Sequence, residues 1–175
     1  MTGGILEVLL VNAEGIEHPH LTWKPTYYLI VECGTQVHRT KISSGKDDKA
    51  WWNEKFAFEL QPSDLKNSTH VKIRIKKSGF FSQGTFAGET TIYLGGIISE
   101  GLDRGLVEVE PAPYNVVLED DTYRGQITLG LKFIANDQER EPKTSISRSI
   151  MSFWKFSWWK FFIKCSHRSP KIKSN

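Results

Sequence analysis

Short runs of apolar residues, each bounded by turn-forming residues, recur along the first 135 positions of the chain. Residues 71–76 alternate strictly, which predicts a strand that turns Lys72, Arg74 and Lys76 outward and the β-branched residues between them inward. Residues 97–102 are expected to form a helical turn. Similar strand-like runs occupy residues 5–11, 26–33, 36–42, 52–60, 90–94, 106–110 and 126–134. Eight runs at this spacing predict an all-β fold, an eight-stranded antiparallel sandwich.

The strand pattern ends near Ala135, and the composition changes there. We therefore expect a domain over residues 1–135, a polar linker over 136–149 and a basic aromatic tail over 150–175. The charge divides at nearly the same place. The first 141 residues hold 15 Lys or Arg and 20 Asp or Glu, a net charge of −5, whereas the remainder holds 8 Lys or Arg and no acid, a net of +8. An acidic domain with a basic tail is typical of proteins attracted to anionic lipid or nucleic acid.

Composition and motifs narrow the class of protein. The chain is 39% hydrophobic and 25% charged, which is enough apolar material for a core. Cys33 ends an apolar run and Cys165 lies in the tail, so we expect no disulfide and a reducing, cytosolic compartment. Residues 1–4 lack the features of a secretory leader. No P-loop, zinc-protease or serine-hydrolase motif occurs, so we expect a binding protein that is not an enzyme and uses no cofactor.

Two polar groups have ordinary interpretations. His18, His20, His38 and His70 lack the spacing of a tetrahedral zinc site and are expected on the surface. The Glu-Asp-Asp cluster at residues 119–121 is expected to form a charged turn between the last two strands.

Four local sequences carry a family resemblance. They are Gly-Ile-Leu-Glu-Val at 4–8 followed by Val-Asn-Ala-Glu-Gly at 11–15, Trp-Asn-Glu-Lys-Phe-Ala-Phe at 52–58, Phe-Ala-Gly-Glu-Thr-Thr-Ile-Tyr at 86–93, and Tyr-Asn-Val-Val at 114–117 leading to Tyr-Arg-Gly-Gln-Ile at 123–127. In this order they resemble C2 domains, specifically the plant group of elicitor-responsive and 16 kDa phloem proteins. The resemblance covers about residues 3–135, leaves out the tail, and implies a C2-type β-sandwich.

The resemblance also bears on calcium. In C2 domains, aspartates from two loops at one end of the sandwich hold Ca²⁺, a hard cation that takes six to eight oxygen ligands. Alignment on the flanking strands puts these ligand positions near His20 and on Thr26, Lys77, Gly79 and Thr85, none of which is an acid. Lys77 would place a positive charge where the ion should sit. We therefore expect the calcium site to be lost and the protein to bind no metal.

The same loop tips are candidates for lipid binding. A calcium-loaded C2 domain docks because the ion inverts the sign of its tips, whereas these tips carry cations and aromatic residues permanently. The candidate residues are Trp23, Lys24, Lys76, Lys77, Phe80 and Phe81. The alternative is that Phe80 and Phe81 pack the base of their loop.

The outward row of Lys72, Arg74 and Lys76 is a second candidate. It resembles, in character, the basic concave strand that some C2 domains use for phosphoinositides. A headgroup would need an adjacent basic cluster, which Arg39 and Lys41 on the strand expected over residues 36–42 could supply. The alternative is a solvated strand face with solubilising charges.

The tail supplies the third candidate. Residues 150–163 include seven aromatic residues, but this run is shorter than the roughly 20 residues that span a bilayer. Trp, Phe and Lys favour the membrane interface, and Cys165 is a candidate for lipidation. The alternative is a tail packed back on the sandwich. The candidate lipid-binding residues here are Trp154, Lys155, Trp158, Trp159, Lys160 and Phe161.

Together these features predict a calcium-independent, phospholipid-binding C2 protein that acts as a peripheral membrane adaptor. Its partners would be anionic membrane lipids, at the plasma membrane or another cytosolic membrane face. Two alternatives remain open. One is an RNA-binding trafficking protein, which the resemblance to phloem proteins suggests, because Trp and Phe can also stack on bases. The other is a protein–protein interaction module without lipid affinity.

Overall fold

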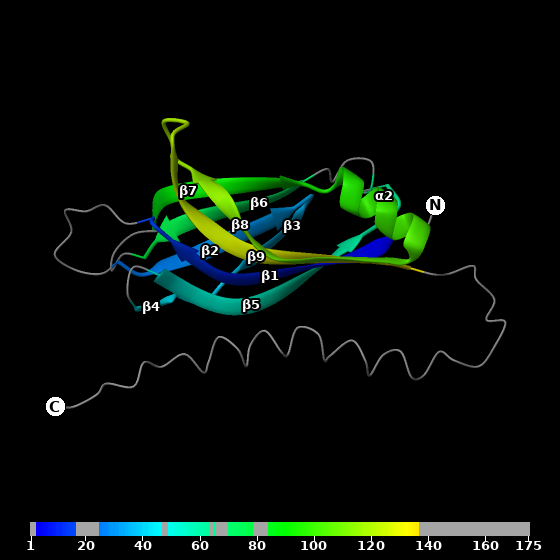
Figure 1. The fold of residues 1–175 in the computed structure, drawn as a ribbon, viewed down its shortest axis with the longest axis horizontal. Coiled ribbons are helices and arrows are strands. Elements are labelled where there is room, and N and C mark those ends of the chain that lie inside the picture. Colours follow the sequence, from blue (N-terminus) through cyan, green and yellow to red (C-terminus); the bar gives the residue numbers. More distant parts are fainter. Residues whose placement is uncertain are drawn as a thin grey trace, which may run out of the picture. The chain divides into compact units, whose positions relative to one another are not determined.

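The computed structural model describes residues 3–16, 25–46, 49–63, 65, 70–78 and 84–136. Within these residues it contains nine strands and one helix (Figure 1). The strands are β1 (Gly4–Glu14), β2 (Tyr27–Cys33), β3 (Gln36–Arg39), β4 (Ser44–Lys46), β5 (Lys49–Leu60), β6 (His70–Lys77), β7 (Thr85–Tyr93), β8 (Leu106–Val117) and β9 (Tyr123–Ala135), and the helix is α2 (Gly95–Arg104).

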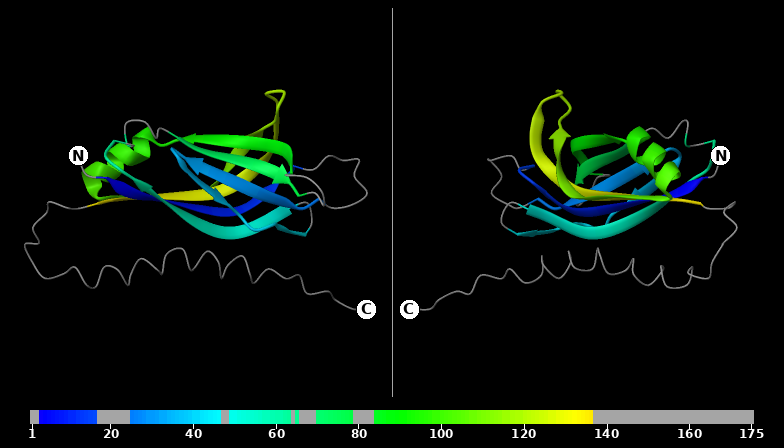
Figure 2. Two further views of the ribbon diagram at one scale, coloured as in Figure 1. Left: turned by 180° about the vertical axis from the view of Figure 1, so that it is seen from behind. Right: turned by 45° about the vertical axis from the view of Figure 1, so that its right-hand side comes forward.

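All strand pairs are antiparallel, in the order β3-β2-β6-β7-β8-β9-β1-β5-β4. The pairing of β7 with β8 is limited to Glu89 and Val117, so the strands separate there into two layers (Figures 1 and 2). One layer is β3-β2-β6-β7, and the other is β8-β9-β1-β5-β4. The predicted antiparallel sandwich is confirmed, with the three-residue β4 added at an edge where we expected a loop.

The core lies between the layers and follows the predicted alternation. Val71, Ile73 and Ile75 are fully buried on β6, and Phe58 on β5 faces them from the other layer with 0% exposure. Burial of each such side chain stabilises the fold by about 1.5–3 kcal/mol. Trp52 is also buried, and its indole Nε1 donates a hydrogen bond to the Tyr27 carbonyl oxygen at 3.4 Å, which ties the two layers together.

Two elements are longer than predicted. Helix α2 has ten residues rather than one turn, and it ends at Gly105, whose φ of 82° gives the left-handed conformation that favours glycine. Strand β8 continues through Pro111 and Pro113. Proline has no amide hydrogen to donate to a neighbouring strand. Strand β8 tolerates both prolines because it pairs with β9 along one side, whereas its other side pairs with β7 only at Val117.

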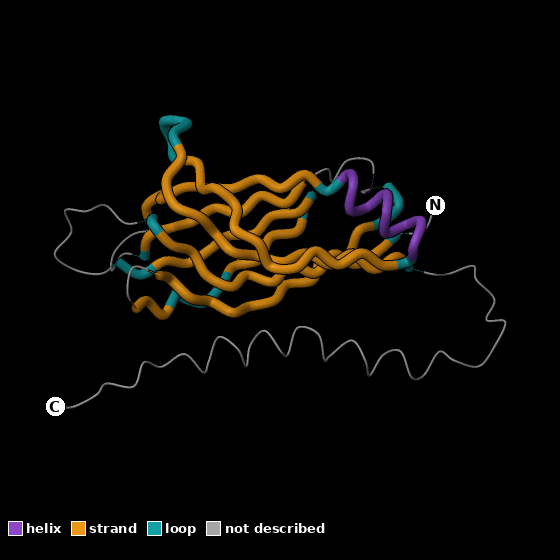
Figure 3. Tube along the Cα trace, viewed as in Figure 1, coloured by secondary structure: helices purple, strands orange, loops and turns teal. Residues whose placement is uncertain are grey.

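The connections gather at two ends. We use "loop end" for the end at which β1 stops and β2 begins, β6 stops and β7 begins, and β8 turns into β9; segment 40–43 lies there beside the start of β2. Helix α2 lies at the opposite end, and the turn between β8 and β9 projects from the sandwich at the loop end (Figures 2 and 3). Among the described residues, no helix is both long and apolar enough to cross a membrane.

Candidate functional site

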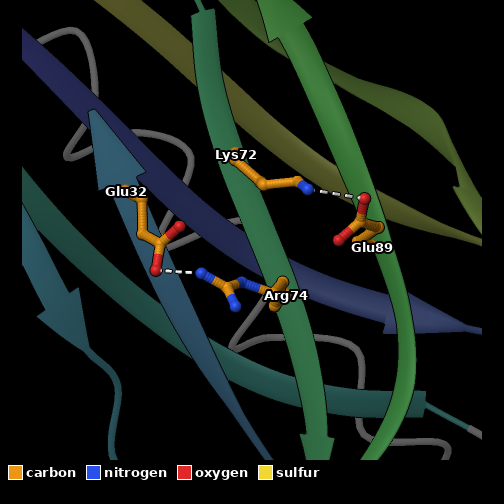
Figure 4. Close-up of polar contacts among 4 residues, drawn as sticks. All are labelled: Glu32, Lys72, Arg74 and Glu89. Atoms are coloured by element: carbon orange, nitrogen blue, oxygen red, sulfur yellow. Dashed lines mark hydrogen bonds and ion pairs between the residues drawn. The ribbon is translucent and has the colours of Figure 1, made fainter. Parts of the chain in front are cut away.

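The outward row on β6 is formed as the alternation predicts. Lys72, Arg74 and Lys76 point away from the core, on the outer face of the β3-β2-β6-β7 layer. Each of the first two cations has an acid on a neighbouring strand (Figure 4). The Nζ of Lys72 lies 2.8 Å from Oε1 of Glu89 on β7, and the guanidinium of Arg74 pairs with the carboxylate of Glu32 on β2.

These two ion pairs neutralise the middle of the row. The hydrogen bond from Arg74 to Glu32 raises the pKa of Arg74, with burial acting in the opposite direction. The Nε of Arg74 is buried and has no hydrogen-bond partner among the described residues. Because both cations already have carboxylate partners, a lipid phosphate would have to compete with Glu32 and Glu89 for them.

A different group of cations lies nearer the loop end. The Arg39 guanidinium lies 3.9 Å from the centroid of the Tyr28 ring, and the Nζ of Lys76 lies 5.8 Å from that of Phe86. Both distances are typical of cation–π contacts. Lys41 is exposed beside them, and its backbone amide donates a hydrogen bond to Oε1 of Glu54 at 2.9 Å.

An exposed apolar residue accompanies these cations. Ile42 is 55% exposed and lies on the segment that runs beside β2 to the loop end, where the Ser43 amide donates to the Tyr27 carbonyl. We call Arg39, Lys41, Ile42, Lys76 and Lys77 the basic edge. An exposed apolar side chain at the same end of a domain as several cations is a combination that favours an anionic lipid interface.

The Tyr28 ring supports the basic edge by packing under Arg39. It faces outward on β2 but is buried, with Arg39 stacked on it. Gly84, at the start of β7, also approaches this ring, because a Cβ at that position would lie 2.6 Å from the Tyr28 hydroxyl oxygen. Its φ of +80° also favours glycine. Gly84 therefore packs directly against Tyr28 of β2.

Three of the five calcium-ligand positions, Thr26, Lys77 and Thr85, lie in the described part of the chain. Register pairs Lys77 with Tyr27 on one side and with Thr85 on the other, so Lys77 lies on the inner face of β6 at the loop end. Thr26 lies beside them, and its carbonyl accepts a hydrogen bond from the Ser78 amide. Over the residues that the structure describes, no group of three or more His, Cys, Asp or Glu side chains could hold a metal ion. His20 and Gly79 lie outside those residues.

Many of the predicted lipid-binding residues lie outside the described part of the chain. This applies to the loop-tip residues Trp23, Lys24, Phe80 and Phe81, and to the tail residues Trp154, Lys155, Trp158, Trp159, Lys160, Phe161 and Cys165. Of the predicted set, the structure places Lys72, Arg74, Lys76 and Lys77 on β6, the first three on its outer face and Lys77 on its inner face.

Sequence reasoning missed three features. The apolar pattern places Ile42 in a strand, whereas it is an exposed residue at the loop end. His38 is half-buried, with its ring stacked on Phe56 at 5.3 Å and edge-on to Phe58 at 4.9 Å, and is not the solvated histidine we expected. The acidic turn at 119–121 formed as predicted, but its location at the loop end was not foreseen.

The fold and this site define a β-sandwich of the C2 class. The C2 domain family model matches residues 4–109, and the chain belongs to this family. Cys33, in the matched region, is buried, as the sequence predicts.

The relatives are small plant proteins. The chain is 34% identical over 157 residues to elicitor-responsive protein 3 from Oryza sativa subsp. japonica, covering 90% of this chain and 99% of the relative. It is 31% identical over 133 residues to 16 kDa phloem protein 2 from Arabidopsis thaliana, covering 76% of this chain and 83% of the relative. The predicted resemblance to this group is therefore confirmed, but its expected extent of residues 3–135 is too short, because the match of 157 residues includes part of the chain outside that range.

Solved structures agree on the fold. A C2 domain-containing protein from an elicitor-responsive gene superposes with a TM-score of 0.63 and 28% identity, covering 80% of this chain and 95% of that one. A C2 domain of plant extended synaptotagmin 1 superposes with a TM-score of 0.58 at 17% identity, covering 78% of this chain and 98% of that one.

Proposed function

We propose that this protein is a calcium-independent C2 protein that binds anionic phospholipids and acts as a peripheral membrane adaptor, rather than as an enzyme. The observation that carries the proposal is the basic edge. Alignment on the flanking strands puts Lys77 at a position where calcium-binding C2 domains have a carboxylate, and Lys76, Arg39, Lys41 and the exposed Ile42 lie at the same end of the domain. The positive charge that calcium supplies elsewhere is here part of the chain.

The lipid affinity expected of the basic edge alone is weak, so stable binding needs a second contact with the membrane. Each Lys or Arg near an anionic surface contributes about 1 kcal/mol. Four such cations give an affinity near the millimolar range, since about 4 kcal/mol corresponds to that dissociation constant. Stable peripheral binding commonly needs two signals. We propose that the tail, with its net charge of +8 and seven aromatic residues, supplies the other one.

The middle of the outer face has a smaller part in this proposal. Lys72 and Arg74 remain candidate lipid-binding residues, but their carboxylate partners Glu89 and Glu32 cancel their charge at short range. We therefore assign more of the electrostatic attraction to Lys76 and Lys77.

Vesicle co-sedimentation of the full chain tests the proposal. Vesicles of phosphatidylcholine, with and without phosphatidylserine, are compared in EGTA and in millimolar calcium. We expect binding only with phosphatidylserine, to the same extent in both buffers. Lys76→Gln with Lys77→Gln should weaken binding. The matched control is Lys55→Gln with Arg104→Gln, which removes two exposed cations away from the basic edge and should not weaken it.

The outcomes separate the alternatives. Binding that requires calcium would contradict calcium independence. Loss of vesicle binding when competitor RNA is added would favour the RNA-binding alternative, because both ligands would then use one basic surface. Failure to sediment with any vesicle would leave a protein-interaction module as the better interpretation.

A further inference from the structure

The turn between β8 and β9 puts negative charge at the same end of the sandwich as the basic edge. Glu119, Asp120 and Asp121 are all exposed there, and we call residues 118–122 the acidic tip. Figures 1 and 2 show that this turn projects from the sandwich. In Figure 1 it stands on the side of the loop end opposite β4, whereas segment 40–43 of the basic edge leads into β4. One end of the domain therefore carries both signs of charge, with segment 40–43 and the acidic tip on opposite sides of it.

Hydrogen bonds cross-link the acidic tip. The Leu118 amide donates to the Thr122 carbonyl at 2.8 Å, and the Asp121 amide donates to the Leu118 carbonyl at 3.2 Å. Oδ1 of Asp120 accepts hydrogen bonds from the amide of Thr122 at 3.1 Å and from its hydroxyl at 2.6 Å. These bonds fix where the carboxylates stand relative to the two strands.

The charge of the acidic tip persists at neutral pH. Hydrogen bonds from Thr122 lower the pKa of Asp120, and the nearby charge of Arg124 lowers it further. The tip and its base thus hold three carboxylates and one guanidinium, so an acidic excess remains.

An acidic excess at a membrane-docking end is a repulsive element. An anionic bilayer attracts cations and repels carboxylates that come within a Debye length, about 8 Å at physiological ionic strength. Repulsion of this kind adds no affinity, but it raises the free energy of any orientation that brings the tip to the surface. The orientation of lowest free energy is then the one that places the basic edge against the bilayer and the acidic tip away from it.

We propose that the acidic tip sets the orientation of the domain on anionic membranes, directing the basic edge to the lipid and keeping Tyr123 out of it. Tyr123 is 73% exposed at the base of the tip, and without the carboxylates its ring would favour the headgroup layer. The inference rests on the proposed lipid binding and adds a determinant of pose and of selectivity against highly anionic surfaces.

A neutralised tip tests the energetic part. The variant is Glu119→Gln with Asp121→Asn, which retains Asp120 because its carboxylate holds the turn. Asn is chosen because the φ of Asp121 is 61°, a conformation that Asn tolerates. With phosphatidylserine vesicles at low ionic strength, we expect the full chain carrying this variant to bind about three- to tenfold more tightly than wild type. The difference should shrink as salt is added.

The matched control removes the same number of charges elsewhere. Glu100→Gln with Asp103→Asn neutralises two exposed carboxylates on α2, at the end of the domain away from the loop end. Both double variants change the net charge equally. If the location of the charge matters, the α2 variant should raise vesicle affinity less than the tip variant. Equal gains from the two pairs would show that net charge alone matters and would overturn the inference.

A fluorescence experiment tests the pose directly. An environment-sensitive dye is attached to the Ile42→Cys variant or to the Tyr123→Cys variant, each with Cys165→Ser, while the remaining Cys33 is buried. With phosphatidylserine vesicles, the dye at position 42 should shift to the blue and the dye at position 123 should not. Neutralising the tip should produce a shift at position 123.

The outcomes distinguish this inference from the function on which it rests. If wild-type protein binds vesicles and the dye at position 123 shifts as strongly as the dye at 42, the orientation is wrong while lipid binding stands. If wild-type protein binds no vesicles under any condition, the proposed function fails, and the orientation fails with it.

Discussion

The ammonium nitrogen of Lys72 lies 2.8 Å from a carboxylate oxygen of Glu89 on the neighbouring strand (Figure 4). Register places Lys72 directly across from Thr91, so the ion pair is diagonal, two residues along β7. Because Lys72 is already paired, a lipid phosphate at this strand would have to displace Glu89. The contact favours a neutralised strand surface over a headgroup-binding site on the outer face of this layer.

The first prediction follows from this pair. Lys72→Ala should lower the free energy of unfolding by about 1 kcal/mol or less, because the pair is partly exposed and screened. It should leave vesicle binding nearly unchanged, whereas Lys76→Ala should weaken it. Urea denaturation and co-sedimentation measure the two effects. If Lys72→Ala weakens vesicle binding as much as Lys76→Ala, the pair opens at the membrane and the whole row is a binding surface.

The second prediction concerns the core. Phe58 is fully buried between the layers, so Phe58→Ala should lower the free energy of unfolding by about 3–5 kcal/mol through lost burial and a residual cavity. Tyr123→Ala removes an aromatic ring that is 73% exposed and should change stability by about 0.5 kcal/mol or less. Comparable urea midpoints for the two variants would show that the inner face of β5 has been misassigned.

The third prediction concerns the contact between Gly84 and Tyr28. Gly84→Ala combines a φ of +80° with a Cβ 2.6 Å from the Tyr28 hydroxyl, and should destabilise the domain by about 1–3 kcal/mol. It should also weaken vesicle binding, because Tyr28 supports Arg39. Gly96→Ala is the control, since a Cβ there meets nothing within 4 Å. Calorimetric melting should rank Gly84→Ala below wild type and Gly96→Ala at or above it.

The sequence predicts which side chains of a strand face the core. It does not predict which side chains of the adjacent strands contact them. Alternation alone places Ile73 and Ile75 in the core and Arg74 outside, because side chains on a strand alternate with period two. Nothing local to β6 shows that Glu32 and Glu89 stand beside it. Those contacts depend on which strands pair and in which register, and such pairing is non-local.

Two further differences from the sequence-based expectation have similar causes. The start of α2 contains Gly95 and Gly96, which weaken a helical pattern, and the helix is stabilised instead by packing, with Gly101 lying close against the ring of Phe133. The exposure of Ile42 depends on the path of segment 40–43 beside β2, where side chains of Thr40 and Ser43 accept hydrogen bonds from the strand. An apolar residue in a strand-like run gives no sign of this path.

The fourth prediction is a pH dependence. Burial raises the pKa of Glu108 above its ordinary value of 4.5, and the charge of Lys132 opposes this shift. Register places Lys132 between Glu108 and Glu7, so all three carry charge across the outer face of one layer. A carboxyl whose pKa is raised by folding favours the protonated folded state. Its stabilising contribution is therefore complete below the ordinary pKa and is lost as the pH rises through the raised value.

Glu108→Gln tests this sign, because glutamine resembles the protonated carboxyl. At about pH 4 and below, the variant and wild type should unfold with similar free energies, whereas at about pH 7 the variant should be the more stable. Urea denaturation of both proteins across this range gives the difference. A variant that is less stable than wild type at neutral pH would mean that the attraction between Glu108 and Lys132 outweighs the burial of Glu108.

The last prediction separates the two forces that we assign to the tail. Attraction between cations and anionic lipid fades with salt, over a Debye length of about 8 Å at physiological ionic strength, whereas burial of aromatic surface does not. Lys155→Glu with Lys160→Glu should therefore weaken vesicle binding mainly at low salt. Trp154→Ala with Trp158→Ala should weaken it at every salt concentration, as measured by co-sedimentation of the full chain across a salt series. Deletion of residues 142–175 should combine both losses and leave the weaker binding of the basic edge; a deletion that binds as tightly as wild type at all salt concentrations would contradict a role for the tail as an anchor.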